Sequence, residues 1–139
     1  MGTNIHASCV DLSGQGILLF GPSGSGKSDL SLRLIMEFGA KLVADDRTNL
    51  IIKDNELIAS APTILEGLIE VRGIGIINLP FCKQSKIKLA INLVSDKETV
   101  ERLPKEDFFE FKNKKIRCFN LNGKEASAPS KILSALTLV

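Results

Sequence analysis

The stretch GPSGSGKSDL, residues 21–30, follows directly on the apolar run GILLF and decides how the neighbouring chain folds. Its first eight residues fit the pattern G-x-x-x-x-G-K-[ST]. In this pattern small residues let successive backbone N–H groups point inward as a nest for an anion, and the following helix adds its positive N-terminal dipole. The stretch therefore predicts a phosphate-binding loop between a buried strand and a helix.

Within this loop, Lys27 is expected to bridge the β- and γ-phosphates of a nucleoside triphosphate, and the Ser28 hydroxyl to ligate Mg²⁺. The alternative is a glycine-rich turn before a helix, with Lys27 exposed to solvent. The residues expected to contact the nucleotide are Gly21, Pro22, Ser23, Gly24, Ser25, Gly26, Lys27 and Ser28.

Hydrophobic periodicity predicts a strand-rich α/β chain with a mixed sheet and more antiparallel hairpins than a doubly wound fold has. The run at residues 17–20 is apolar on both faces, so we expect it at the centre of the sheet. The further expected elements are a helix at residues 28–38 that Gly39 ends, strands at 41–44, 74–79 and 86–94, hairpins at 3–20, 49–60 and 110–121, a short helix near 97–103, and a last helix near Pro129.

Composition is typical of an ordinary soluble protein. The 139 residues fit a single domain over 1–139, with 44% apolar and 24% charged residues. A net charge of +2 is too weak to indicate a nucleic-acid or membrane partner. Three cysteines without metal-like spacing argue against structural zinc and suit a reducing compartment. Because the N-terminus has no charged region and no long apolar run, we expect a cytoplasmic protein.

Acidic residues elsewhere in the chain could complete a phosphate site. Asp45 and Asp46 follow the strand at 41–44, where one carboxylate can lie near a metal while the other acts as a base; the alternative is a surface Asp-Asp turn. Glu70 and Arg72 are two residues apart, so they share a face in an extended segment. The alternative for this second pair is an ion pair on a bulged strand edge.

Together His6, GPSGSGKS, LVADD at 42–46 and EVRGIGIINL at 70–79 resemble the HPr kinase/phosphorylase family. These bacterial enzymes phosphorylate a serine of HPr, the phosphocarrier protein of the sugar phosphotransferase system. The resemblance covers residues 4–105 and only the family's C-terminal catalytic domain, so a short version of the family is expected. It implies a P-loop kinase domain of the HPr kinase and PEP carboxykinase-like type, acting as an ATP-dependent protein serine kinase with HPr as substrate.

The resemblance also assigns residues. Asp46 matches the family's proton acceptor, which donates the proton in the reverse direction. His6 matches an active-site histidine, although on its own it would be taken as a strand residue; Arg102 matches a catalytic arginine and would otherwise be an exposed helix residue. The implied catalytic residues are His6, Lys27, Asp46 and Arg102, and the implied metal ligands are Ser28 and Glu70. Asp45, the neighbour of Asp46, remains a further metal candidate from the paired-carboxylate argument.

The family forms hexamers through its catalytic domain, so we expect a homo-oligomer. Removal of phosphate from HPr is a second family activity. The family's late arginine-rich segment, which is linked to this activity, has no good match here.

Two other functions stay open. A P-loop kinase for a small metabolite would be expected to carry an arginine-rich lid. A non-catalytic nucleotide-binding regulator of the GTPase kind would need an Asn-Lys-x-Asp string, and residues 113–116 lack its aspartate.

Overall fold

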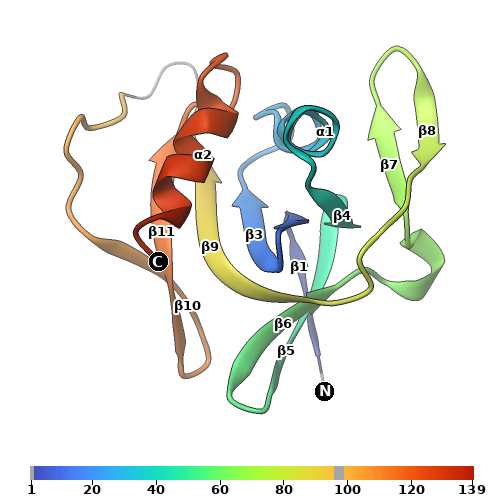
Figure 1. Cartoon of the computed structure of the whole chain (residues 1–139), viewed down its shortest axis with the longest axis horizontal. Coiled ribbons are helices and arrows are strands. Elements are labelled where there is room, and N and C mark those ends of the chain that lie inside the picture. The colour runs from blue at the N-terminus through green and yellow to red at the C-terminus, as the bar shows by residue number, and fades with distance from the viewer. Residues whose placement is uncertain (1, 96–98) are drawn as a thin grey trace.

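The computed structural model describes residues 2–95 and 99–139. A curled mixed sheet carries both helices on one side, and a separate two-stranded hairpin stands beside the first helix (Figure 1). In chain order the elements are β1 (Thr3–His6), β2 (Ser8–Leu12), β3 (Gln15–Phe20), α1 (Lys27–Phe38), β4 (Lys41–Ala44), β5 (Arg47–Lys53), β6 (Glu56–Ser60), a 3₁₀ turn (Thr63–Leu65), β7 (Leu68–Val71), β8 (Gly75–Asn78), β9 (Ser85–Leu93), β10 (Asp107–Phe111), β11 (Lys114–Leu121) and α2 (Ala128–Leu136).

The main sheet runs in the order β1-β5-β6-β9-β3-β2-β4. Strand β11 pairs with the later part of β9, on the edge opposite β3, and also pairs with β10. Both β3 and β11 run parallel to β9, whereas the remaining paired strands are antiparallel. The start of β9 pairs with β6 and its later part with β3 and β11, which requires β9 to curl along its length (Figure 1). The sheet is therefore mixed and rich in hairpins, as the sequence predicts.

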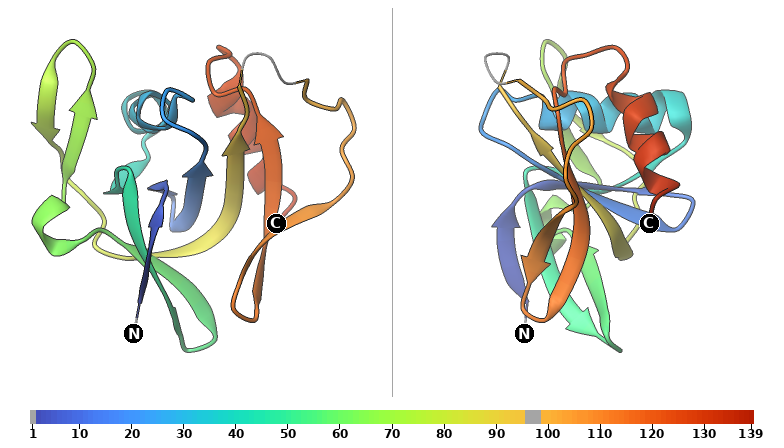
Figure 2. Two further views of the ribbon diagram at one scale, coloured as in Figure 1. Left: turned by 180° about the vertical axis from the view of Figure 1, so that it is seen from behind. Right: turned by 90° about the vertical axis from the view of Figure 1, so that its left-hand side faces the viewer.

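Alternation along β3 builds a core on both faces of the sheet. Ile17 and Leu19 are fully buried and pack in the cluster that contains Leu34 of α1. Leu18, between them, is fully buried in the opposite cluster with Leu50 of β5. Both helices cover the first face (Figure 2), and the strands of the hairpins cover the second. The apolar run at 17–20 therefore lies at the centre of the sheet, which fixes the origin of the phosphate loop.

Glycine and turn residues end the elements where the sequence predicts. Helix α1 ends at Gly39, whose φ of 77° is left-handed. The β5–β6 hairpin turns at Asp54 and Asn55 with φ of 52° and 63°, the backbone that a two-residue turn requires. Helix α2 has Pro129 in its first turn.

Two expectations about local structure are wrong. Residues 3–12 do not form one strand of a hairpin: the chain kinks at Ala7, whose N–H donates to the Ile5 carbonyl, and β1 pairs with β5 instead of β3. The short helix expected near 97–103 is not formed over residues 99–103, and its first residues lie outside the described ones. That stretch is largely exposed, so a short helix there would bury no face that could stabilise it.

Candidate active site

The phosphate loop joins the centre of the sheet to α1. Gly21, Gly24 and Gly26 have φ of 149°, 83° and 97°, which favour glycine. A Cβ on Gly21 would lie 2.6 Å from Ser25 Oγ and 2.9 Å from the carbonyl oxygen of Leu93, so a side chain does not fit there. Repeated left-handed residues are typical of loops whose amides converge on an anion.

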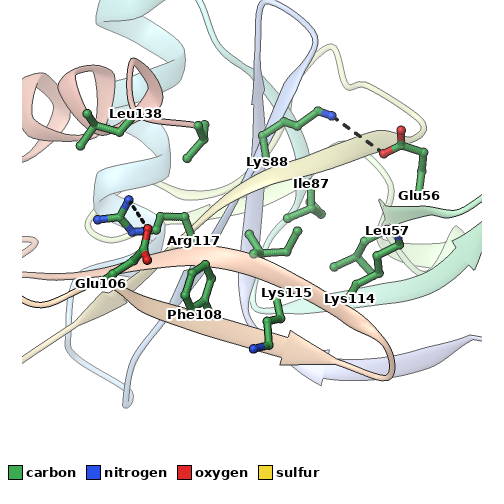
Figure 3. A pocket seen from close by; sticks show the side chains of 12 residues that line it. Glu56, Leu57, Ile87, Lys88, Glu106, Phe108, Lys114, Lys115, Arg117 and Leu138 are labelled. Carbon is green, nitrogen blue, oxygen red and sulfur yellow. Dashed lines mark ion pairs between the residues drawn. The ribbon is translucent and has the colours of Figure 1, made fainter.

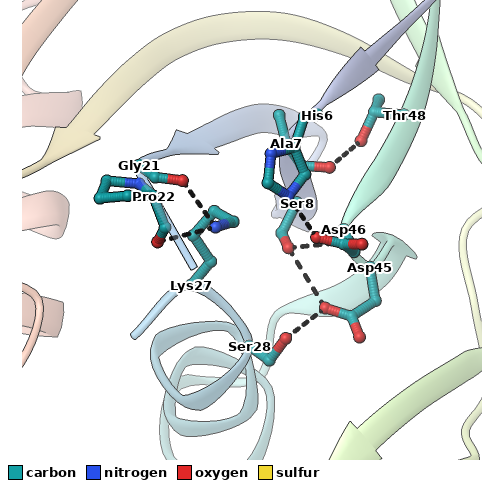
Figure 4. A network of polar contacts seen from close by, with 10 residues as sticks. All are labelled: His6, Ala7, Ser8, Gly21, Pro22, Lys27, Ser28, Asp45, Asp46 and Thr48. Carbon is teal, nitrogen blue, oxygen red and sulfur yellow. Dashed lines mark hydrogen bonds and ion pairs between the residues drawn. The ribbon is translucent and has the colours of Figure 1, made fainter. Parts of the chain in front are cut away.

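The charge and donors inside this loop fit a phosphate. Lys27 is only 7% exposed, and its Nζ donates to the carbonyl oxygens of Gly21 at 2.7 Å and Pro22 at 3.3 Å (Figure 4). Carbonyl oxygens carry only partial charge, so the buried ammonium is still strongly attracted to an anion. Ser25 is 6% exposed, and its Oγ has no hydrogen-bond partner within the described chain. The loop thus has positive charge and an unsatisfied buried hydroxyl where a phosphate is predicted to bind.

Asp45 is held against the start of α1. Its Oδ1 accepts a hydrogen bond from Ser28 Oγ at 2.6 Å and from Ser8 Oγ at 3.2 Å (Figure 4). Its Oδ2 accepts from the backbone N–H of Glu70 at 3.3 Å. These contacts connect α1, β2, β7 and the end of β4 through one carboxylate. They place the predicted metal-ligating hydroxyl directly beside a predicted metal-ligating acid.

The two adjacent aspartates point to different partners. Asp46 has a left-handed φ of 67°, which aspartate tolerates better than most residues, and its N–H donates to Ser8 Oγ at 3.0 Å. This turn directs Asp46 away from Ser28 and toward His6, whose Nε2 lies 2.6 Å from Asp46 Oδ1 (Figure 4). The β1–β5 pairing brings His6 there because it lies opposite Arg47.

A cavity of about 570 Å³ opens where these groups meet. The phosphate loop and the start of α1 form one side of the cavity. The other side is formed by Asp45 and Asp46, which follow β4, and by residues 70–72 of the β7–β8 hairpin. The cavity therefore brings together most of the residues that the sequence singled out. Its charged lining consists of Lys27, Asp29, Asp45, Asp46, Glu70, Arg72 and Lys124.

One predicted catalytic residue lies elsewhere. Arg102 is exposed on the connection between β9 and β10 and does not line the cavity. His6 does not line it either, but it reaches the site through its contact with Asp46. The structure thus joins His6 to the other candidates and leaves Arg102 apart.

The oxygen donors fit Mg²⁺. No group of three or more histidine, cysteine, aspartate or glutamate side chains suited to a metal occurs in residues 2–95 and 99–139. Mg²⁺ does not need such a cage, because it is usually bound by one or two carboxylates together with substrate phosphates and water. The Ser28 hydroxyl and the Asp45 carboxylate supply ligands of this kind next to the phosphate loop.

A second cavity, of about 380 Å³, lies between the β10–β11 hairpin, β9 and the C-terminal residues (Figure 3). Its rim carries ion pairs of Lys88 with Glu56 at 3.9 Å and of Arg117 with Glu106 at 3.5 Å. No residue of the predicted site lines this cavity. The first cavity is therefore the candidate active site.

Sequence reasoning missed two contributors to that site. Ser8 is fully buried and bridges the Asp45 carboxylate and the Asp46 N–H. A serine two residues after His6, at the start of the strand SCVDL, is the only local signal for it. Lys124 lies after β11, far from every motif in sequence, and lines the cavity. Only the folded chain reveals it.

A buried central strand that leads into a phosphate loop, with an acid–hydroxyl pair at the next strand end, defines a P-loop nucleotide-binding domain of the kinase type. Residues 1–138 match the family model of the HPr Serine kinase C-terminal domain, and the chain belongs to this family.

Curated relatives and a solved structure agree with this assignment. The chain is 42% identical to HPr kinase/phosphorylase of Lactobacillus acidophilus over 100 residues, which cover 66% of this chain and 31% of that protein. It is 40% identical to HPr kinase/phosphorylase 1 of Oceanobacillus iheyensis over 111 residues, covering 73% and 36%. The Hpr(Ser) kinase/phosphatase structure from Coxiella burnetii superposes with a TM-score of 0.83 at 26% identity, covering 98% of this chain and 88% of that chain. The matched region thus spans about a third of the length of these curated relatives.

Proposed function

We propose that this chain is an ATP-dependent protein serine kinase and that the phosphocarrier protein HPr is its acceptor. The observation that carries the proposal is the pair of contacts on neighbouring aspartates: Asp45 with Ser28 beside the phosphate loop, and Asp46 with His6. Phosphoryl transfer needs both a metal position and a proton acceptor, and the two contacts divide these roles between adjacent carboxylates. The relatives named HPr kinase/phosphorylase support HPr as the acceptor.

The phosphate loop positions the donor. Loop amides and the N-terminus of α1 bind the phosphates of ATP, and Lys27 exchanges its two loop carbonyls for phosphate oxygens. In this role Lys27 stabilises the charge that develops on the transferred group. Ser28, Asp45 and Glu70 would hold Mg²⁺, which when bound neutralises charge on the β- and γ-phosphates.

Asp46 prepares the acceptor. Its carboxylate accepts the proton of the serine hydroxyl as that oxygen bonds to the γ-phosphorus and the bond to ADP breaks. A carboxylate can only accept hydrogen bonds, so Nε2 of His6 donates in their contact and fixes the orientation of Asp46. Asp46 remains 60% exposed at its side chain, which leaves it accessible to a protein substrate.

The decisive experiment incubates the purified chain with γ-labelled ATP, Mg²⁺ and HPr, and maps the label by mass spectrometry. Label on one HPr serine supports the proposal. Hydrolysis of ATP without label on HPr would instead favour a nucleotide-binding regulator, and label on a small hydroxyl compound would favour a metabolite kinase. A role for Arg102 requires the β9–β10 connection to approach the cavity, so Arg102→Ala should be assayed in the same reaction.

The proposal also covers a second activity, the oligomeric state and the location of the protein. Removal of phosphate from HPr by the same site is the second proposed activity: the relatives named kinase/phosphorylase and kinase/phosphatase support it, whereas the lack of a match to the late arginine-rich segment argues against it. We expect a homo-oligomer, a hexamer by family resemblance, acting in the cytoplasm without nucleic-acid or membrane partners. Across the described ranges 2–95 and 99–139, no helix has both the length and the apolar character to cross a bilayer. Sedimentation of the purified chain tests the oligomer.

A further inference from the structure

The segment of residues 122–125, between β11 and α2, lies against the phosphate loop. A Cβ on Gly123 would come within 3.2 Å of the Ser25 carbonyl oxygen and 3.0 Å of the Leu93 side chain, so glycine allows this close approach. One residue further on, Lys124 lines the cavity, and its Cγ lies 3.9 Å from the position that a Cβ on Gly26 would take. A lysine distant in sequence therefore covers the loop that is predicted to hold phosphate.

A single arginine of α1 holds this segment in place. The guanidinium of Arg33 donates from Nη1 to the Glu125 carbonyl oxygen at 3.1 Å and from Nη2 to the Gly123 carbonyl oxygen. Its Nε donates to Asp29 Oδ2 at 3.1 Å, which fixes the third side of the group. The two carbonyls flank Lys124 in the chain, so Arg33 restrains the backbone on both sides of it. A lysine could not supply this rigid fork.

The charges around the cavity explain why a second lysine near the loop would favour phosphate binding. Four carboxylates line it, those of Asp29, Asp45, Asp46 and Glu70. A triphosphate entering among them is repelled unless cations offset the added negative charge. Three cations line the cavity: Lys27 within the loop, Arg72 in the β7–β8 turn and Lys124 on the covering segment. Of these, Lys27 and Lys124 lie against the phosphate loop itself.

We propose that Lys124 is a second lysine that contacts the bound phosphates, and that Arg33 is a positioning residue that holds Lys124 in place over the loop. The inference rests on the proposed function in taking ATP as the ligand. The chemistry is that of any polyphosphate, so the anion site can be tested separately from phosphoryl transfer.

The test measures binding of ATP and of inorganic tripolyphosphate by titration calorimetry. Lys124→Met should weaken both ligands about 10-fold, because a charge-assisted contact is lost. The thermal unfolding temperature of this variant is measured alongside, so that a loss of affinity is separated from a loss of stability. Lys131→Met is the matched control: it removes a lysine that pairs with the Glu125 side chain at 2.9 Å outside the cavity, and it should bind both ligands as the wild type does.

The positioning role is tested by a double-mutant cycle. Arg33→Met and Arg33→Lys should each weaken both ligands in the wild-type background and add little once Lys124 is already Met, because Arg33 acts through Lys124. A purely structural effect of Arg33 would be equal in both backgrounds. In the Arg33 variants the Asp29 carboxylate loses its arginine partner and adds uncompensated negative charge to the cavity. Repeating the cycle in the Asp29→Asn background removes this contribution.

Wild-type affinity for both ligands in Lys124→Met overturns the inference, and so does an equal effect of the Arg33 variants in both backgrounds. The proposed function fails separately if wild-type protein binds tripolyphosphate in a Lys124-dependent way but labels no HPr; the anion site then stands. If wild-type protein binds neither ligand, both proposals are wrong.

Discussion

Nε2 of His6 lies 2.6 Å from Oδ1 of Asp46, although 40 positions separate the two residues in the chain. The contact depends on the kink at Ala7, which transfers the start of the chain from the β2–β3 hairpin to the edge of β5. There His6 lies opposite Arg47, next to the left-handed turn at Asp46. The pairing of β1 with β5 therefore builds the proposed base together with its orienting group.

Asp46→Asn should retain ATP binding and lose phosphoryl transfer by about 100-fold or more, because the amide cannot accept the serine proton. Transfer is measured as label on HPr, and binding by calorimetry. The matched control is Asp54→Asn, the same chemical change in the β5–β6 turn at a φ of 52° that asparagine also adopts readily. A wild-type rate of HPr labelling in Asp46→Asn would show that another group accepts the proton.

His6→Ala should reduce transfer less than Asp46→Asn does, because it removes the group that orients the base rather than the base. Combined with Asp46→Asn it should cause no further loss, since the two residues act as a unit. The measurement is the rate of HPr labelling at saturating ATP in the four members of the cycle. Independent, multiplying effects of the two substitutions would separate His6 from the function of Asp46.

Lys27→Met should abolish measurable ATP binding, since it removes the buried ammonium that neutralises the phosphates. The loop should keep its shape, because methionine has a length similar to that of lysine and only the donor to the carbonyls of Gly21 and Pro22 is lost. Lys41→Met, at an exposed position of β4, provides a control of equal charge change. Undiminished ATP affinity in Lys27→Met would place the nucleotide elsewhere.

Asp45→Asn should raise the Mg²⁺ concentration needed for half-maximal transfer, because one charged oxygen beside Ser28 becomes neutral. Excess Mg²⁺ should restore part of the rate in this variant but none in Asp46→Asn, which separates a metal position from a base. Glu37→Gln, on the exposed side of α1, should leave the Mg²⁺ dependence unchanged. An unshifted Mg²⁺ dependence in Asp45→Asn would remove Asp45 from the metal site.

Much of the fold could be predicted because its signals are local. The run at 17–20, the stripe on α1 with Gly39 after it, and the turn at 54–55 each specify an element without reference to the rest of the chain. The partner of β1 could not be predicted. Apolar alternation shows that a segment is a strand, but β1 joins β5 through a kink at Ala7 that has no periodic signal.

The residues of the site also differ in whether a local sequence signal predicts them. The phosphate loop and the acids after β4 lie in contiguous motifs, and the structure places both on one cavity. Ser8 and Lys124 carry no motif; tertiary packing alone brings them to the site, through the bridge to Asp45 and through the Arg33 contacts. The sequence predicts a helix at Arg102, whereas residues 99–103 form none, and the exposed Arg102 does not line the cavity.

The stability of the protein should fall above pH 8.5 because of two thiols. Burial, followed by the charge of Asp11, raises the pKa of Cys9 well above its ordinary range, and burial followed by Asp107 raises the pKa of Cys118. At high pH the unfolded chain releases these protons while the folded chain keeps them. The free energy of unfolding therefore decreases as pH rises from the unfolded pKa of about 8.5, by up to about 1.4 kcal/mol per pH unit for the fully buried Cys9. The half-buried Cys118 contributes in the same direction but less, because water still reaches its thiolate.

Urea unfolding between pH 8 and 10 measures this slope, and the chain has no tyrosine to contribute to it. Cys9→Ala should lower stability at neutral pH and flatten the slope. Val43→Ala, a fully buried position in the same cluster, should lower stability without flattening it, because no ionisable group is lost. An identical slope in Cys9→Ala and the wild type would show that the Cys9 thiol ionises as readily in the folded protein as in the unfolded chain.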